Sequence, residues 1–160
     1  MKSKIPVPTK YLLNPVHFIA LGFGSGLMPK APGTFGTLAA IPVYLLLKDL
    51  SLAFYLAAVI LVCLLGVYAC FYTSTALKVH DHPAIVIDEI AGYLITMIAV
   101  PFAWQWVLVG FILFRFFDIL KPWPISWIDK HVHGGSGIML DDILAGVFAF
   151  IVLQIMVRVI

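Results

Sequence analysis

Two pairs of adjacent acidic residues carry the clearest chemical signal in this sequence. Asp88-Glu89 and Asp141-Asp142 each open a hydrophobic segment, with Gly92 and Gly146 about one helical turn further along. A glycine at that spacing shares a helix face with an acidic residue and lets two helices approach closely. Four carboxylates gathered in this way repel one another, and a hard divalent cation with oxygen ligands would offset their charge. The pairs predict a Mg²⁺ site whose ligands are Asp88, Glu89, Asp141 and Asp142.

The alternative is that these acidic residues lie at helix N-termini because the helix dipole favours negative charge there. One pair alone would not decide between the two interpretations. Two pairs with the same small-residue context, in a chain with eight acidic residues in total, favour the metal site.

A loop rich in glycine and proline is a candidate phosphate-binding segment. Gly33-Thr34-Phe35-Gly36-Thr37 follows Pro29-Lys30-Ala31-Pro32 and leads into a hydrophobic run. Glycine N–H groups, the Lys30 ammonium group and the Thr34 hydroxyl group at a helix N-terminus suit an anion. The spacing differs from that of the nucleotide-binding P-loop, so neither ATP nor GTP is inferred. An ordinary loop with a threonine cap stays open as the alternative.

Arg115, Asp118 and Lys121 follow one another at intervals of three residues. Arg115 could bind phosphate through two N–H groups while Asp118 orients its guanidinium group, and Lys121 would add a second cation. The alternative is an intrahelical salt bridge, with Lys121 extending its ammonium group toward the membrane interface.

Two histidine-containing segments, His80-Asp81-His82 and His131-Val132-His133, complete the polar set. His80 or His133 could protonate a departing alkoxide. Asp81 is a candidate base and a candidate covalent nucleophile. A zinc site is a weaker alternative, because no cysteine lies near and the spacing is not a standard zinc pattern. Structural or capping roles stay open for at least two of these four histidines.

The composition indicates an integral membrane protein. Of the 160 residues, 62% are apolar and 11% are charged, and the mean hydropathy is +1.07. Soluble domains contain about 25% charged residues. The length predicts one domain over residues 1–160, and residues 1–21 fit a retained interfacial segment better than a cleavable signal. A net charge of +2 without a dense basic run argues against nucleic-acid binding.

Five hydrophobic runs separate the polar stretches: Thr37–Leu47, Leu52–Leu77, Ile90–Val100, Trp106–Phe117 and the run from Ile143 onward. Two of them are only 11 residues long, whereas a transmembrane helix needs about 20. The short runs are either re-entrant or core helices, or parts of longer helices that continue through polar residues, as over Ile85–Val100. We favour longer helices, because polar residues are tolerated where they face protein or a water-filled cavity. The prediction is an all-α, polytopic membrane bundle.

If each run crosses the bilayer, all polar stretches reach one side: Gly22–Thr37, His80–Glu89, Arg115–Pro124, Asp129–Gly137 and Asp141–Asp142. Eight of the ten Lys and Arg residues, with Lys2 and Lys4 among them, lie on that side, and Lys48 and Arg158 lie on the other. The positive-inside rule then predicts a site that faces the cytoplasm. Interfacial tryptophans are predicted at the opposite turn (Trp104, Trp106) and on the side of the site (Trp123, Trp127).

Taken together, these stretches resemble the bacterial phosphatidylglycerophosphatase A family. The matching segments are Gly24–Leu27, Pro32–Thr34, His80-Asp81, Ile85–Glu89, Phe114–Asp118, Lys121–Pro124, Asp129 and His133–Asp142. The similarity covers about residues 20–150, in order, with no departure at the charged positions of the motifs.

The resemblance implies an all-helical, Mg²⁺-dependent phosphatase in the bacterial cytoplasmic membrane. Its substrate would be a phospholipid in the bilayer, phosphatidylglycerophosphate, which would be converted to phosphatidylglycerol and inorganic phosphate. A membrane transporter or ion channel is the main alternative, since it would also retain intramembrane carboxylates. A transporter should, however, distribute polar residues through the depth of the membrane. A non-catalytic scaffold is a third possibility, but it has no need of two acidic helix starts.

Overall fold

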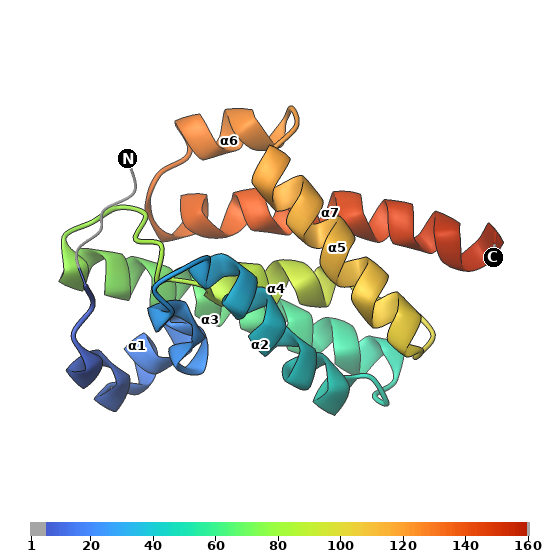
Figure 1. Cartoon of the computed structure of the whole chain (residues 1–160), viewed down its shortest axis with the longest axis horizontal. Helices are drawn as coiled ribbons and strands as arrows, with labels where there is room; N and C mark the ends of the chain where they lie inside the picture. Colours follow the sequence, from blue (N-terminus) through green and yellow to red (C-terminus); the bar gives the residue numbers. More distant parts are fainter. Residues whose placement is uncertain (1–5, 160) are drawn as a thin grey trace.

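The structure, a computed structural model, describes residues 6–159; the predicted contributions of Lys2 and Lys4 therefore lie outside the described residues. Over that range all regular structure is helical, as predicted (Figure 1). The elements are η1 (Thr9–Leu13), α1 (Pro15–Ala20), η2 (Gly22–Leu27), α2 (Pro32–Leu47), α3 (Leu52–Leu77), α4 (Ile87–Thr96), α5 (Trp104–Leu120), α6 (Ile125–His131) and α7 (Gly134–Val159).

Two of the described helices, α3 and α7, are long and apolar enough to span a membrane. Each has 26 residues, or about 39 Å at 1.5 Å per residue, and a hydrocarbon core is about 30 Å thick. The outward side of α3 exposes large apolar side chains, among them Phe54, Ile60 and Leu64 at 60–70% of their surface. An apolar surface of this extent is typical of association with a membrane.

Three of the hydrophobic runs, among them the short run Thr37–Leu47, prove to be parts of longer helices. α2 begins at Pro32, five residues before its apolar run, α5 extends to Leu120, and α7 begins at Gly134. The expected helix over Ile85–Val100 is wrong in its bounds, because α4 covers Ile87–Thr96 and Ala99 has a positive φ of 55°. Every residue of α4 except Glu89 is buried. α4 is therefore a core helix, the alternative that the sequence left open.

The second acidic pair does not open its helix. Asp88 and Glu89 lie in the first turn of α4, as expected, but Asp141 lies seven residues after the first residue of α7. α7 begins before the acidic pair, in a segment of small residues that packs closely on α3. A Cβ on Gly135 in this segment would come within 2.8 Å of Phe71 on α3. The acidic pair consequently faces the interior from within a helix and does not cap it.

α4 and α7 cross at the two glycines predicted to allow a close approach. A Cβ on Gly146 would overlap the carbonyl oxygen of Gly92 and lie 3.1 Å from its Cα atom, and a Cβ on Gly92 would lie 2.7 Å from the carbonyl oxygen of Asp142. The buried hydroxyl group of Thr96 donates to the Gly92 carbonyl at 3.0 Å. This contact of backbone on backbone sets the separation of the two helices that carry the acidic pairs.

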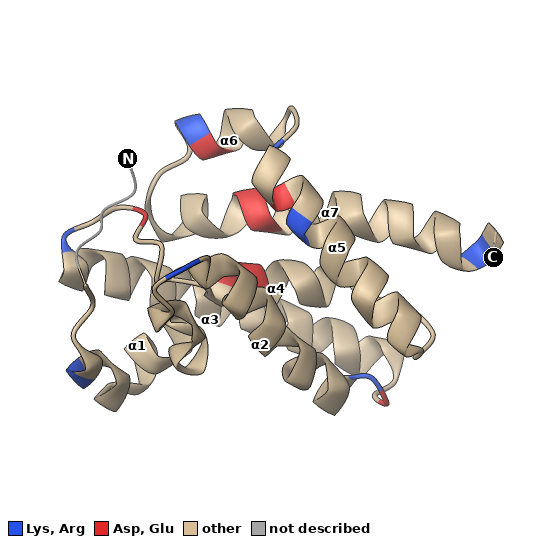
Figure 2. Ribbon diagram, viewed as in Figure 1, with Lys and Arg blue, Asp and Glu red and all other residues tan. Residues whose placement is uncertain are grey.

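The two turns predicted opposite the polar stretches lie together. The Lys48 ammonium group forms an ion pair with Asp49 and lies 4.5 Å from the centre of the Phe102 ring. Figure 2 shows this charged turn and Arg158 well apart from the acidic residues on α4 and α7. Trp104, Trp123 and Trp127 are exposed, as interfacial anchors should be, but Trp106 is buried against the core, so its predicted anchoring role is wrong.

We predict that Gly146→Val destabilises the fold, because its side chain would collide with the backbone of Gly92. Inserting side-chain atoms into a tightly packed contact costs about 1–3 kcal/mol. The midpoint of thermal unfolding in detergent should fall by several degrees. Ala57→Val, an exposed position on α3, is the matched control and should leave the midpoint unchanged. Equal midpoints for the two variants would contradict this account of the crossing.

Candidate active site

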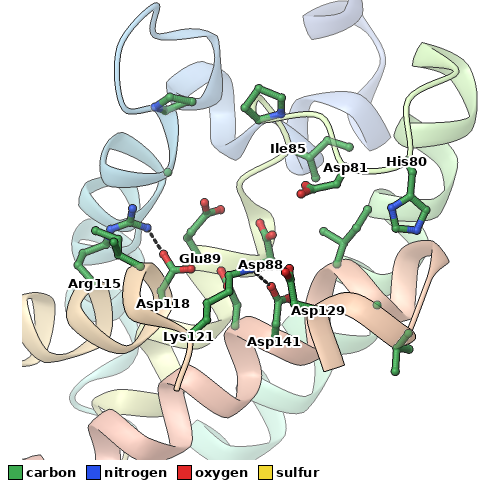
Figure 3. A pocket seen from close by; sticks show the side chains of 18 of the residues that line it. His80, Asp81, Ile85, Asp88, Glu89, Arg115, Asp118, Lys121, Asp129 and Asp141 are labelled. Atoms are coloured by element: carbon green, nitrogen blue, oxygen red, sulfur yellow. Dashed lines mark hydrogen bonds and ion pairs between the residues drawn. The ribbon is translucent and has the colours of Figure 1, made fainter. Parts of the chain in front are cut away.

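All five polar stretches contribute to one cavity of about 330 Å³ (Figure 3). Seven of the eight acidic residues of the chain line it, and Asp49 is the exception. Arg115 and Lys121 are the two Lys or Arg residues in its lining. Negative charge is therefore in large excess, and a phosphate group would be repelled unless cations offset the carboxylates.

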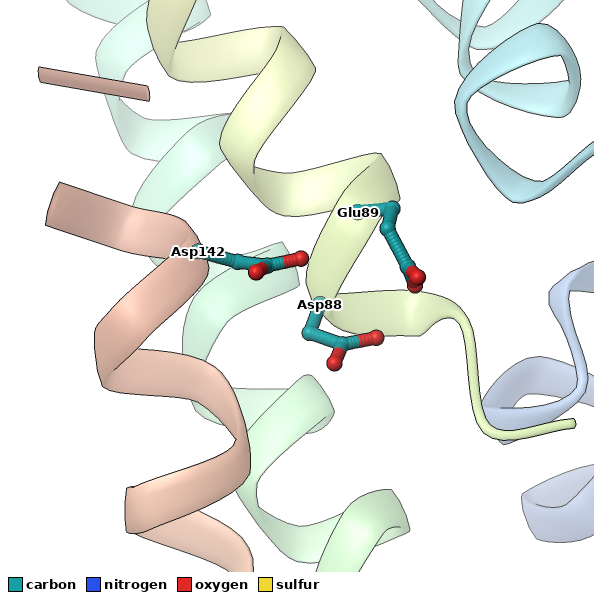
Figure 4. A group of neighbouring side chains, drawn as sticks. All are labelled: Asp88, Glu89 and Asp142. Atoms are coloured by element: carbon teal, nitrogen blue, oxygen red, sulfur yellow. The ribbon is translucent and has the colours of Figure 1, made fainter. Parts of the chain in front are cut away.

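The inner part of the cavity holds a compact group of carboxylates. Asp88 and Glu89 from α4 and Asp142 from α7 each offer one oxygen, and these three oxygens lie within 4.8 Å of one another (Figure 4). Asp141, the fourth predicted ligand, lies beside this group, but its Oδ2 atom accepts a hydrogen bond from Lys121. The structure thus brings the four residues to one cavity and separates Asp141 from the central three.

Buried carboxylate oxygens without a donor support a metal-binding role for this group. One oxygen each of Asp88, Glu89, Asp141 and Asp142 is buried and has no hydrogen-bond partner among the described residues. An unpaired buried anion is costly, and a cation is the usual remedy. Oxygen-only donors of this kind fit Mg²⁺.

The raised pKa values of Asp88 and Glu89 also support a cation-binding role for this group. Burial, with the neighbouring Glu89 carboxylate as the second cause, raises the pKa of Asp88 well above its ordinary value. Burial also raises the pKa of Glu89, to about 8, with Asp142 adding to the effect and the contacts with Asp88 and Arg115 opposing it. Without a cation, these groups therefore hold protons more tightly than exposed carboxyl groups do.

Arg115 lies on the side of the cavity next to the N-terminus of α2. It forms an ion pair with Asp118, one turn further along α5, which is the intrahelical salt bridge that the spacing allowed; a role in phosphate binding stays a prediction. A Cβ on Gly33 would overlap a carboxylate oxygen of Glu89 and lie 3.1 Å from the Arg115 guanidinium group. Glycine at this position lets the N-terminus of α2 lie close to the ends of both side chains. The buried Nε atom of Arg115 has no partner among the described residues.

Lys121 lies at the C-terminus of α5 and contacts two acidic residues. Its ammonium group donates to Asp129 at 2.6 Å and to Asp141. Burial by itself would lower the pKa of Lys121, but the two carboxylates raise it above its ordinary value. Lys121 therefore remains charged. Asp129 was not singled out by chemical reasoning from the sequence; its only signal was its place in a segment that matches the family.

His80 and Asp81 lie at another part of the cavity wall, as Figure 3 shows. The Nε2 atom of His80 accepts a hydrogen bond from the backbone N–H group of Gly134 at 2.6 Å, so its proton resides on Nδ1 when the ring is neutral. His133 does not line the cavity; its ring packs edge-on against His80 at a centroid distance of 5.2 Å.

The predicted phosphate-binding loop reaches the cavity through different residues from those expected. Ala31, Pro32 and Gly33 line the cavity, whereas Lys30 and Thr34 do not. Lys30 is exposed, and the Thr34 backbone N–H group donates to Ala31 at 3.0 Å. Nine of the twelve predicted site residues thus line one cavity, and the three that do not are Lys30, Thr34 and His133.

We predict a loss of stability with rising pH when divalent cations are removed with EDTA. The pKa of Glu89 is about 8 in the folded protein and about 4.3 in an unfolded chain, so the folded state binds this proton more tightly. The resulting stability is present at low pH and is lost as the pH rises through 8. Thermal unfolding between pH 5 and pH 9 should show this fall.

Glu89→Gln should reduce that pH dependence, because it removes one of the buried carboxyl groups that titrate. Asp49→Asn changes an exposed carboxylate at the opposite turn and should leave the slope unaltered. A slope that is the same in Glu89→Gln and in the unsubstituted protein would contradict the assignment.

Comparison with known proteins identifies the family of this chain. A family model described as Phosphatidylglycerophosphatase A matches residues 18–157. A protein of that name from Escherichia coli (strain K12) is 53% identical over 137 residues, which cover 85% of this chain and 80% of that protein. Another, from Haemophilus influenzae, is 48% identical over 154 residues, which cover 95% of this chain and 94% of that protein. No solved structure matches the chain. The chain belongs to the phosphatidylglycerophosphatase A family.

Proposed function

We propose that the protein hydrolyses the terminal phosphomonoester of phosphatidylglycerophosphate, using bound Mg²⁺, and releases phosphatidylglycerol and inorganic phosphate. The observation that carries this proposal is the single cavity that gathers seven carboxylates and two cationic side chains. Membership of the family named for this reaction supports the choice of substrate.

Asp88, Glu89 and Asp142 would hold the metal ion, and Asp141 would complete or flank its ligands. Mg²⁺ bound there would offset the carboxylate charge and polarise the phosphoryl group of the substrate. The fit rests on three oxygens within 4.8 Å of one another and on the buried oxygens that lack a donor. The number of ions follows from no feature of the described residues, so the proposal requires only one.

The cationic side chains bind the substrate phosphate. Arg115, held in orientation by Asp118, donates to its oxygens from one side, and Lys121 donates from another. Both interactions strengthen as negative charge builds up on the transferred group. Asp81 is the candidate base or nucleophile, and His80 is the candidate donor of a proton to the departing glycerol oxygen. His133, which packs against the ring of His80, is a positioning residue.

The site lies at one end of a membrane-embedded bundle and faces the cytoplasm in this proposal. Support comes from the distribution of basic residues, since Lys48 and Arg158 are the only two predicted on the other side. Exposed apolar side chains adjoin the cavity, including Ile119 in its lining and Leu120 and Trp123 beside it. A lipid headgroup would enter from this side while the acyl chains stay in the bilayer.

The distribution of charge disfavours a transporter. Outside the cavity, the Lys, Arg, Asp and Glu residues of α2–α5 and α7 lie near helix ends, as Lys48 and Arg158 do. A transport pathway for ions would need polar groups through the membrane depth. Within the described helices, the acidic residues gather on one cavity instead.

Phosphate release from phosphatidylglycerophosphate in detergent micelles tests the function directly. Purified protein should release inorganic phosphate with Mg²⁺ and stop when EDTA is added. Glu89→Gln and Asp142→Asn should each lower kcat by about 10² or more, as expected for groups that hold a catalytic metal ion. Asp49→Asn should remain active. Folded protein that releases no phosphate under either condition would refute the proposal.

Cysteine labelling in membrane vesicles tests the orientation. In a background that carries Cys63→Ala and Cys70→Ala, Lys130→Cys on α6 should react with an impermeant maleimide only in inside-out vesicles. Asp49→Cys should react only in right-side-out vesicles. Both positions are exposed. Labelling of both from the same side would overturn the proposed placement in the membrane.

A further inference from the structure

Lys121 forms two ion pairs of different depth in the cavity. Asp141 is a buried residue of α7, and 9% of its side-chain surface is exposed. Asp129 lies on α6, and 40% of its side-chain surface is exposed. Figure 3 shows both carboxylates beside the Lys121 ammonium group. The lysine is thus held from the inside by one carboxylate and from the solvent side by another.

The outer carboxylate is carried by a small element. α6 has seven residues, packs mainly on α7, and lies beyond the rest of the bundle in Figure 1. Only Ile125, at its first position, is fully buried. Asp129 lies one turn further along and belongs neither to the three-carboxylate group nor to the unpartnered oxygens. Its carboxylate forms an ion pair with Lys121 at 2.6 Å.

A carboxylate and a phosphate oxygen compete for the same donor. Both accept charge-assisted hydrogen bonds from an ammonium group at similar distances. Lys121 is one of two Lys or Arg residues in a cavity with seven carboxylates, so an incoming phosphate group has few cations available. Of the two carboxylates bound to Lys121, the exposed one costs less to return to water.

We propose that Asp129 occupies, on Lys121, the position that a substrate phosphate oxygen takes, and that the phosphate group displaces it when substrate binds. This inference rests on the proposed function, because it takes the phosphate end of the substrate into this cavity. Asp129 is then a positioning residue that sets substrate affinity: it keeps Lys121 directed into the cavity and limits the binding of weak phosphate ligands.

The test is the equilibrium binding of inorganic phosphate to the purified, Mg²⁺-loaded full chain in detergent, measured by isothermal titration calorimetry. Asp129→Asn keeps the shape of the side chain and removes its charge. It should tighten phosphate binding about two- to fivefold, the range expected for a partly exposed ion pair. The KM for phosphatidylglycerophosphate should fall in parallel, while kcat changes little.

The Lys121→Gln background separates direct competition from a general change in charge. If Asp129 acts by occupying Lys121, Asp129→Asn has no effect on phosphate binding once Lys121 is replaced. A tightening that persists in Lys121→Gln would show a general electrostatic effect and would overturn the proposal. The control is Asp49→Asn, which breaks an ion pair of the same kind with Lys48 at the opposite turn and should leave phosphate binding unchanged.

Unchanged or weaker phosphate binding in Asp129→Asn would also overturn the proposal, as would a failure of the unsubstituted protein to bind phosphate. Phosphate binding that tightens as expected, in a protein that does not hydrolyse phosphatidylglycerophosphate, would refute the proposed function and leave the role of Asp129 in place.

Discussion

The crossing of α4 and α7 at Gly92 and Gly146 is the contact on which the site depends. Because backbone lies directly against backbone there, the first turn of α4 and the third turn of α7 are brought close enough for Asp88, Glu89 and Asp142 to share a space less than 5 Å across. Bulkier residues at the crossing would push the helices apart and open that space. A packing constraint in the core thus sets the geometry of the chemistry.

In this arrangement, the requirements of stability and of function conflict. Like charges in a low-dielectric interior repel strongly, and the raised pKa values of Asp88 and Glu89 express that cost. The fold tolerates it because α4 is surrounded by neighbouring helices, and the two acidic residues in its first turn, Asp88 and Glu89, both face the cavity. A bound cation would convert the destabilising group into a stabilising one, which links folding to metal binding.

Much of this architecture could be predicted from residue types and spacing. The hydrophobic runs located α3 to the residue, and the acidic pairs with their glycines predicted the α4–α7 crossing. The length of α4 could not be predicted, because its end depends on a backbone turn at Ala99 and on burial by helices distant in sequence. Lys30 and Thr34 were plausible anion donors by type, but whether a loop side chain points into a cavity depends on the path of the backbone, which spacing does not record. Asp129 has no acidic neighbour in sequence, and its partner Lys121 is brought to it by the turn between α5 and α6.

The proposed position of the cavity at the membrane surface would restrict which substrates can use it. The exposed apolar surface of α3 fits a lipid environment, whereas the carboxylates require water and cations, so the proposed function places the site where the two environments meet. A lipid with a phosphorylated headgroup already has its polar part at that level. Only the headgroup would then have to enter the cavity, and the exposed apolar side chain of Ile119, which lines it, could remain in contact with the chains that stay behind. Soluble phosphate esters lack this anchoring and would have to bind through Arg115, Lys121 and the metal ion alone. In the proposed placement, location alone would favour membrane-bound substrates before any specific contact with the headgroup is made.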